Sequence, residues 1–87
     1  MKPYGNRCVV LIEKNYLKEK GKQVLGEDGT PKYEIGQEGK VISSNLEGIK
    51  KGMNVIANYR GGMPVIRLEN KKSVTVIFES DDIHAIL

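Results

Sequence analysis

Short apolar runs separated by polar turns dominate the hydrophobic pattern of this chain. Arg7–Glu13 (RCVVLIE) is apolar and rich in β-branched residues, which predicts a strand buried on both faces. In the run Ser73–Phe78, Ser73 and Thr75 alternate with valines, so we expect this strand to keep one face in solvent. The other predicted strands are Gly39–Ser43, Asn54–Tyr59, Met63–Leu68, which Pro64 places at a sheet edge or a strand start, and Ile83–Leu87. No ten residues show helical periodicity, and six short strands predict an all-β fold, a small barrel.

One long segment, Lys14–Gln37, breaks this pattern. It is rich in glycine and charge and has no sustained period, and it is far longer than the roughly 2–6 residues that usually connect elements of a compact domain. The segment is therefore either functional or disordered. Between Lys18 and Thr30 its only apolar pair is Val24-Leu25, which is either incidental or a hydrophobic hook presented to a partner.

The size of the chain favours self-association. Its 87 residues predict a single domain, residues 1–87, and such a chain buries only about 60–65% of its unfolded surface. Cys8 is the only cysteine and His84 the only histidine, so neither a disulfide within the chain nor a structural zinc site is expected. The first and last strands are both apolar, and we expect the end of one subunit to pair with the start of the next, which closes a ring.

Charge and hydropathy narrow the possible partners. The net charge of +3 is too mild to predict nucleic-acid binding by itself, although Lys50-Lys51 and Lys71-Lys72 keep a small basic nucleic-acid-binding barrel as the alternative. No run approaches the 18 apolar residues of a membrane span, and the N-terminus has no apolar signal-peptide core. We expect a cytoplasmic protein without membrane partners.

No constellation of side chains predicts catalysis. His84 has no histidine or cysteine partner nearby, and Asp81 and Asp82 are adjacent, which is typical of a turn rather than of an acid/base pair. Cys8 lies within a strand, where a small buried hydrophobe is expected. Gly26–Thr30 resembles a phosphate loop only faintly, since it carries two acids and lacks the lysine. We predict a non-enzyme with no catalytic residue, no cofactor and no metal site.

Five segments, in order, are similar to motifs of one family. The chain resembles the GroES-type co-chaperonins (the chaperonin-10 family) along nearly its whole length. The opening KPYGNRCVVLIE is similar to "(R/K)PL-x-DRV-V", and GKVI at 39–42 to "GEV-x-A". KGMNVI at 51–56 is similar to "VGD-x-V-x-F", NYRGG at 58–62 to the "YGG" turn, and the ending ESDDIHAIL to "ESDILAIV".

This resemblance implies a GroES-like barrel and a lid function. Family members form seven-subunit rings that cap an ATP-loaded GroEL-type chaperonin and enclose an unfolded client without binding it tightly. The long segment would be the family's mobile loop, and its hydrophobic tripeptide falls on Gln23, Val24 and Leu25. The subunit interface implied for a homo-heptamer involves Tyr4, Arg7, Ile83, Ala85 and Ile86.

The chain departs from the family at three places. Gln23 stands where the family has Ile or Val, and Lys22 stands in place of a glycine. The family also inserts a roof hairpin between its "GEV" and "VGD" segments, for which Ser43–Lys51 is too short. The resemblance therefore implies a roofless ring, similar to bacteriophage-encoded co-chaperonins, acting in the host cytoplasm of a phage or in a divergent bacterium.

Overall fold

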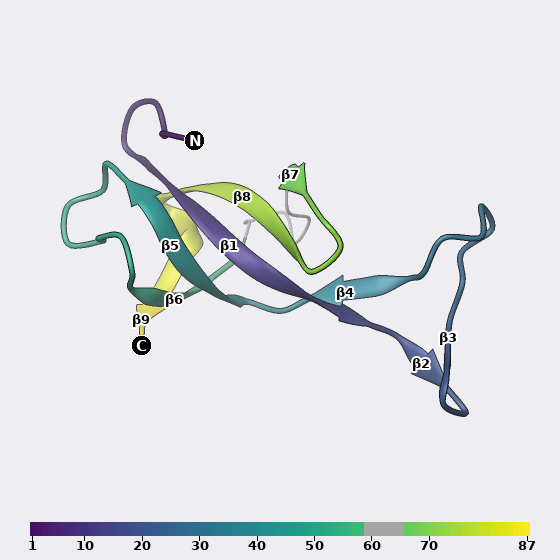
Figure 1. The fold of residues 1–87 in the computed structure, drawn as a ribbon. Helices are drawn as coiled ribbons and strands as arrows, with labels where there is room; N and C mark the ends of the chain where they lie inside the picture. The colour runs from purple at the N-terminus through teal and green to yellow at the C-terminus, as the bar shows by residue number, and fades with distance from the viewer. Residues whose placement is uncertain (59–65) are drawn as a thin grey trace.

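The fold is a strongly curved β-sheet from which a long arm projects (Figure 1). The computed structural model describes residues 1–58 and 66–87, with side chains for all of them except Ile66 and Arg67. Within these residues the regular elements are strands and one short 3₁₀ turn, which confirms the all-β expectation. The strands are β1 (Arg7–Tyr16), β2 (Lys18–Glu19), β3 (Lys22–Gln23), β4 (Tyr33–Ile35), β5 (Glu38–Ser44), β6 (Asn54–Ala57), β7 (Ile66–Glu69), β8 (Ser73–Glu79) and β9 (Ile83–Ile86), and the 3₁₀ turn η1 covers Ser80–Asp82.

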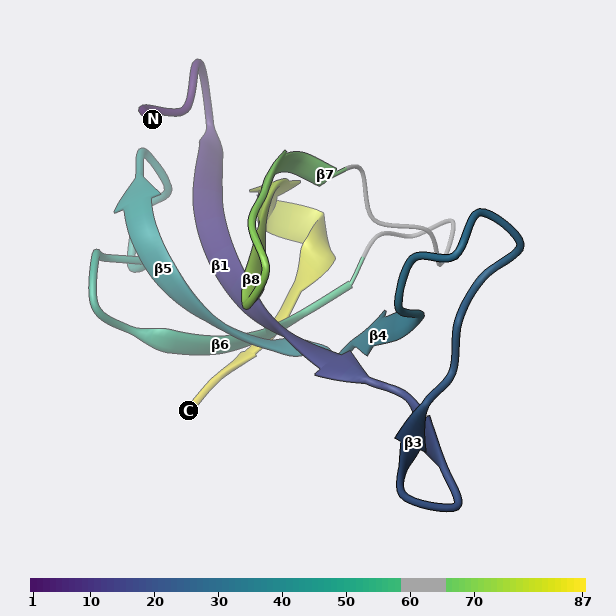
Figure 2. The same ribbon diagram turned by 45° about the vertical axis from the view of Figure 1, so that its right-hand side comes forward.

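The main sheet follows the order β7-β8-β1-β5-β6-β9, and β4 pairs with the outer end of β1. Every strand pair in it is antiparallel. Figure 2 shows the sheet curling so that β6 and β9 cross beneath β1. Among the described strands, β7 and β9 end the path without pairing with each other, so the hydrogen-bonded sheet is open rather than a closed barrel.

The position of β1 corrects one expectation from the sequence. The first strand was expected at an edge, available to a neighbouring subunit, but β1 lies at the centre of the sheet. It pairs with β8 along Arg7–Glu13 and with β5 along Cys8–Leu11, so both of its edges are occupied within the chain. Of the first and last strands, β9 alone is a sheet edge, because among the described strands it pairs only with β6.

Small β-branched residues from both halves of the chain fill the core. Its buried members are Cys8, Val10, Ile12, Val41, Val55, Ala57, Val74, Val76 and Phe78. Val9, on the opposite face of β1, is also fully buried, which confirms a first strand buried on both faces. The solvent-facing side predicted for β8 is wrong: Ser73 and Thr75 are buried. Thr75 lies between Leu11 of β1 and Leu68 of β7 in the register, so it is flanked by a leucine on each side.

The predicted strands otherwise agree with the observed ones within a few residues, where the chain is described. Tyr59, the turn Arg60–Gly62 and the start of the predicted strand Met63–Leu68 lie outside the described residues. β5 and β6 are joined by residues 45–53, which contain turns and no strand.

The segment predicted to be irregular is shorter than expected. β1 continues to Tyr16 and pairs with β4, with Lys14 opposite Ile35 and Tyr16 opposite Tyr33. The pairing leaves residues 17–32 as an arm beyond the sheet, and the molecule measures 44 × 24 × 23 Å along its principal axes. The core residues therefore occupy one end of an elongated molecule (Figures 1 and 2).

Gly39 provides a test of this packing. A Cβ at Gly39 would lie 2.4 Å from Val10 Cγ1 and 2.9 Å from both Ile12 Cγ1 and the Leu11 carbonyl oxygen. We expect Gly39→Ala to lower the free energy of unfolding by roughly 1–3 kcal/mol, the usual cost of overpacking a core. The nearby Gly36→Ala is the matched control, since its Cβ would meet only the Glu38 nitrogen, at 4.0 Å. Urea titrations that find the two variants equally stable would contradict the packing at the β1–β5 contact.

Candidate functional site

The stem of the arm is the paired part of β1 and β4, where Lys14–Tyr16 lie opposite Tyr33–Ile35. A cluster of polar and aromatic side chains fastens this stem to the sheet. The Lys14 ammonium donates a hydrogen bond of 2.7 Å to Glu69 Oε1 and lies 4.2 Å from the centre of the Tyr33 ring. The Tyr33 hydroxyl donates to Glu69 Oε2 at 3.2 Å, and the Tyr16 and Tyr33 rings meet edge to face, 5.9 Å apart. The Tyr16 hydroxyl also donates to the Lys71 carbonyl oxygen. These contacts tie β1 and β4 to the β7–β8 turn, so the arm leaves the sheet in a fixed direction.

The electrostatics of this cluster agree with a formed ion pair. The hydrogen bond from Lys14 is the main cause of a lowered pKa for Glu69, and the Tyr33 hydrogen bond adds to it. Burial lowers the pKa of Lys14, but the hydrogen bond and the charge of Glu69 together outweigh it, so that pKa is raised. The pKa of Tyr33 is raised by burial and by its hydrogen bond to Glu69. All three shifts favour Lys14 and Glu69 charged and Tyr33 neutral at physiological pH.

Beyond the stem, three backbone hydrogen bonds close a cycle, which we call the junction. The Leu17 amide donates to the Lys32 carbonyl at 3.0 Å, the Lys32 amide to the Val24 carbonyl at 2.8 Å, and the Val24 amide to the Leu17 carbonyl at 3.0 Å. The junction therefore joins the stem to two hairpins. The first is β2–β3, and the second brings Leu25 opposite Pro31.

The predicted hook, Gln23, Val24 and Leu25, lies at this junction. Val24 is half-buried, and its backbone contributes both a donor and an acceptor to the cycle. Gln23 is exposed at the end of β3, and Leu25 exposes 55% of its surface at the start of the second hairpin. The structure thus brings the three residues together on the arm, with Leu25 as the apolar side chain most open to a partner.

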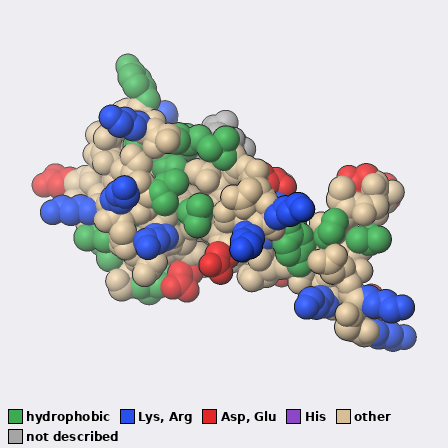
Figure 3. All heavy atoms as spheres, viewed as in Figure 1, with side chains coloured by type: hydrophobic (Ala, Val, Ile, Leu, Met, Phe, Trp, Pro, Cys, Tyr) green, Lys and Arg blue, Asp and Glu red, His purple; other side chains and the backbone are tan. Residues whose placement is uncertain are grey.

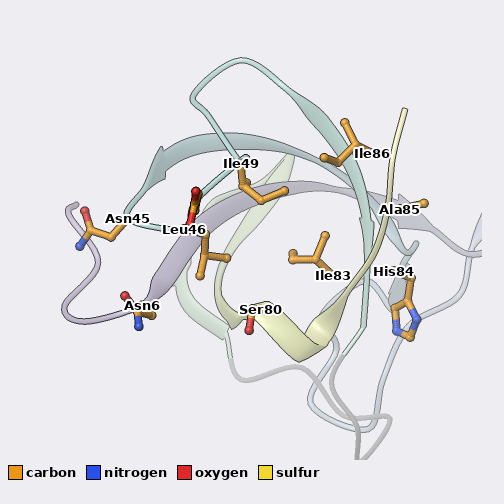
Figure 4. A pocket seen from close by; sticks show the side chains of 10 residues that line it. Asn6, Asn45, Leu46, Ile49, Ser80, Ile83, His84, Ala85 and Ile86 are labelled. Carbon is orange, nitrogen blue, oxygen red and sulfur yellow. The ribbon is translucent and has the colours of Figure 1, made fainter.

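A second candidate site follows the free edge of β9. A groove of about 670 Å³ runs beside this strand. Figure 4 shows Leu46, Ile49 and Ile83 directed into the groove, with Asn6 and Asn45 at its rim and His84 turned away. Ile86 also lines the groove and exposes 52% of its surface. An unpaired strand edge beside exposed apolar side chains is a surface on which another strand can pair.

The predicted interface residues fall into two groups. Ile83, Ala85 and Ile86 lie together on β9 and line the groove. Tyr4 and Arg7 lie on the N-terminal side, where Tyr4 is 89% exposed and Arg7 pairs with Glu79 at 3.5 Å. The N-terminal segment is held at the groove rim, because the Asn45 side-chain amide donates to the carbonyl oxygens of Pro3 and Gly5 at 2.8 and 3.1 Å.

The residues considered as candidates for catalysis differ in their burial. Cys8 is fully buried, and burial, with a smaller effect of the Asp82 charge, raises the pKa of its thiol to about 11. A thiol of this kind is a poor nucleophile at neutral pH. Asp82 is buried and accepts a hydrogen bond from the Glu79 amide at 2.9 Å, which caps η1. His84 is exposed on β9.

The described part of the chain contains no group of three histidine, cysteine or acidic side chains placed to hold a metal ion. It also contains no helix long and apolar enough to cross a membrane.

Sequence reasoning missed the stem cluster and the junction. Lys14, Tyr16 and Tyr33 lie in the segment that the sequence predicts to be irregular, and Glu69 lies just after the predicted strand Met63–Leu68. The alternation of Lys14, Tyr16 on one strand and Tyr33, Ile35 on the other was the available signal, since residues two apart share a face of a strand. The junction depends on backbone atoms and left no signature in side-chain type.

Comparisons with known proteins give no relative. No protein family, no curated protein and no solved structure matches the chain.

The turn of the first hairpin offers a test of whether the arm is formed in solution. Lys20 and Gly21 both have positive φ, 52° and 79°, as in a type I′ turn, for which Asn-Gly is the favoured pair. We expect Lys20→Asn to stabilise the hairpin and to slow hydrogen exchange of the Val24 amide several-fold. Gly21→Val, which places a β-branched residue at positive φ, should speed that exchange. If neither variant changes the rate, the first hairpin is not formed in the free protein.

Proposed function

We propose that this protein is a ring-forming co-chaperonin that caps an ATP-loaded GroEL-type chaperonin and encloses an unfolded client. The observation that carries the proposal is the arm, a projecting element fixed at its stem that presents Leu25 at its outer part. Burying this side chain in an apolar groove of another molecule would remove apolar surface from water. The resemblance of five segments to the co-chaperonin motifs supports the same function.

The arm suits weak and reversible capture. Isolated two-stranded hairpins are marginally stable in water, so the outer arm exchanges readily between formed and open states. Gln23 stands where an aliphatic side chain would bury more apolar surface, which lowers the affinity of each arm. Several arms tethered in one ring recover affinity through effective concentration, while each arm remains able to release when the chaperonin changes state.

The β9 edge supports the ring. We infer that the groove beside Ile83 and Ile86 receives the N-terminal segment of a neighbouring subunit, whose Tyr4 is almost fully exposed in the single chain. Such a contact would pair the free edge and cover apolar surface in one step. Repeated around a symmetry axis it closes a ring, and seven subunits is the number that the resemblance implies. Arg7 and Ala85 would lie at the margins of this contact.

The connection between β5 and β6 bears on the shape of the lid. Residues 45–53 contain no strand, so this position holds no hairpin that could form a roof. We infer a ring that is open at its centre. The chaperonin cavity and the ring would together confine the client, without a dome above it.

Leu25 is the residue whose loss tests the proposal. If Leu25 enters an apolar groove, Leu25→Ala removes roughly 1–2 kcal/mol per captured arm. The losses compound over several arms, so the ring should dissociate much faster from an ATP-loaded GroEL-type chaperonin. Leu68→Ala is the matched control, because Leu68 lies on the body with nearly the same exposure, 56% against 55%. Equal dissociation rates for the parent and for both variants would exclude the arm as the binding element.

Native mass measurement tests the ring separately. We expect an oligomer, with seven subunits as the specific expectation, and we expect Ile86→Glu to dissociate it. The substitution places a charge on an exposed position of the β9 edge, where it would be buried only in the assembled ring. The monomer of this variant should retain the circular dichroism of the parent. A parent protein that is a stable folded monomer at micromolar concentration would contradict the ring.

A further inference from the structure

The two hairpins of the arm carry opposite charge. The first, residues 18–23, contains Lys18, Lys20 and Lys22 against a single acid, Glu19, and we call it the basic hairpin. The second, residues 25–31, contains Glu27 and Asp28 and no basic residue, and we call it the acidic hairpin. Figure 3 shows the two groups of charge on separate lobes of the arm. The charges are therefore separated in space as well as along the chain.

The hydrogen bonds of the arm keep this separation. The junction links Leu17, Val24 and Lys32 in a cycle, so the two hairpins branch from one point. In the acidic hairpin, Asp28 Oδ1 accepts hydrogen bonds from the Thr30 hydroxyl and amide, at 2.6 and 3.1 Å. The Gly26 amide donates to the Thr30 carbonyl at 2.8 Å, which closes the hairpin.

The charged side chains of the two hairpins are available to a partner. All six charged side chains of the two hairpins are exposed, and none forms an ion pair with another described residue: Lys18, Glu19, Lys20, Lys22, Glu27 and Asp28. The hydrogen bonds from Thr30 hold the pKa of Asp28 below its usual value, so this carboxylate stays charged over the physiological range. Between the two sets of charge lie Val24 and the exposed Leu25.

We propose that the arm docks in one direction only, in an apolar groove of a protein partner that is acidic on one side and basic on the other. In this arrangement Val24 and Leu25 fill the groove, the basic hairpin lies against the acidic side, and the acidic hairpin lies against the basic side. Apolar burial supplies the affinity, while complementary charges set the orientation and the rate of encounter. The proposal rests on the proposed function and adds the chemistry of the partner's surface.

The distribution of charge also selects the class of partner. A nucleic acid presents phosphates of one sign and would attract the basic hairpin but repel the acidic one. A partner protein can carry both signs beside an apolar groove. The arm therefore matches a protein surface better than a polyanion.

Association kinetics with an ATP-loaded GroEL-type chaperonin at low salt test the proposal. Two variants change one hairpin each: Lys18→Glu with Lys20→Glu, and Glu27→Lys with Asp28→Asn, which keeps an acceptor oxygen for Thr30. We expect each pair to lower the association rate constant roughly tenfold, and the effect to shrink when salt screens the charges. The matched control is Lys50→Glu with Lys51→Glu, which changes the net charge as much as the first pair but lies on the β5–β6 turn, and it should leave the rate nearly unchanged.

The acidic-hairpin variant gives the decisive result. If the arm is steered only by net positive charge, Glu27→Lys with Asp28→Asn will speed association, and the directional proposal is wrong. It is also wrong if the Lys50/Lys51 control slows association as much as the Lys18/Lys20 variant. A parent ring that binds normally while all three variants match it would overturn the direction and leave the proposed function intact. A parent ring that does not bind the chaperonin at all would overturn both.

Discussion

The hydrogen bonding of β1 on both of its edges is the constraint on which the rest of the structure depends. The strand pairs with β8 on one side and β5 on the other, and its side chains are buried on both faces from Cys8 to Val10. The same strand continues past the core to Tyr16 and forms one side of the arm's stem. A displacement of β1 would therefore change the core, the direction of the arm and the position of the N-terminal segment together.

The positions of most strands and the burial of Cys8 could be predicted from the pattern of side chains. Runs of β-branched residues predicted each strand of the main sheet that could be compared except β4, which lies in the segment predicted to be irregular. The burial of the lone cysteine was predicted from its place in the first strand. The pattern failed where backbone pairing decides. A central and an edge strand with the same apolar residues look alike, so β1 was placed at an edge. Ser73 and Thr75 alternate as solvent-facing residues would, yet both are buried in the folded sheet, where strands pair with β8 on both sides.

The candidate site likewise has one part that the sequence predicts and other parts that depend on the pairing of strands. Val24-Leu25 could be found because it is the only apolar pair in a polar stretch, and Leu25 is exposed on the arm. The stem cluster of Lys14, Tyr33 and Glu69 joins residues far apart in the chain, and only the three-dimensional register brings them within hydrogen-bonding distance. The junction is formed by peptide groups, which every residue carries, so no residue type could mark it.

The continuity of β1 from the core into the stem has a mechanical consequence. A force applied to the outer arm along the strand loads the β1–β8 and β1–β5 ladders in shear, so that many hydrogen bonds resist it at once. The hairpins beyond the junction are held by a few bonds and would open one at a time under the same load. Under tension, the hairpins at the outer end of the arm would therefore open first, while the sheet keeps its fold. The hairpins could re-form once the load is removed, because the sheet to which they are attached stays intact.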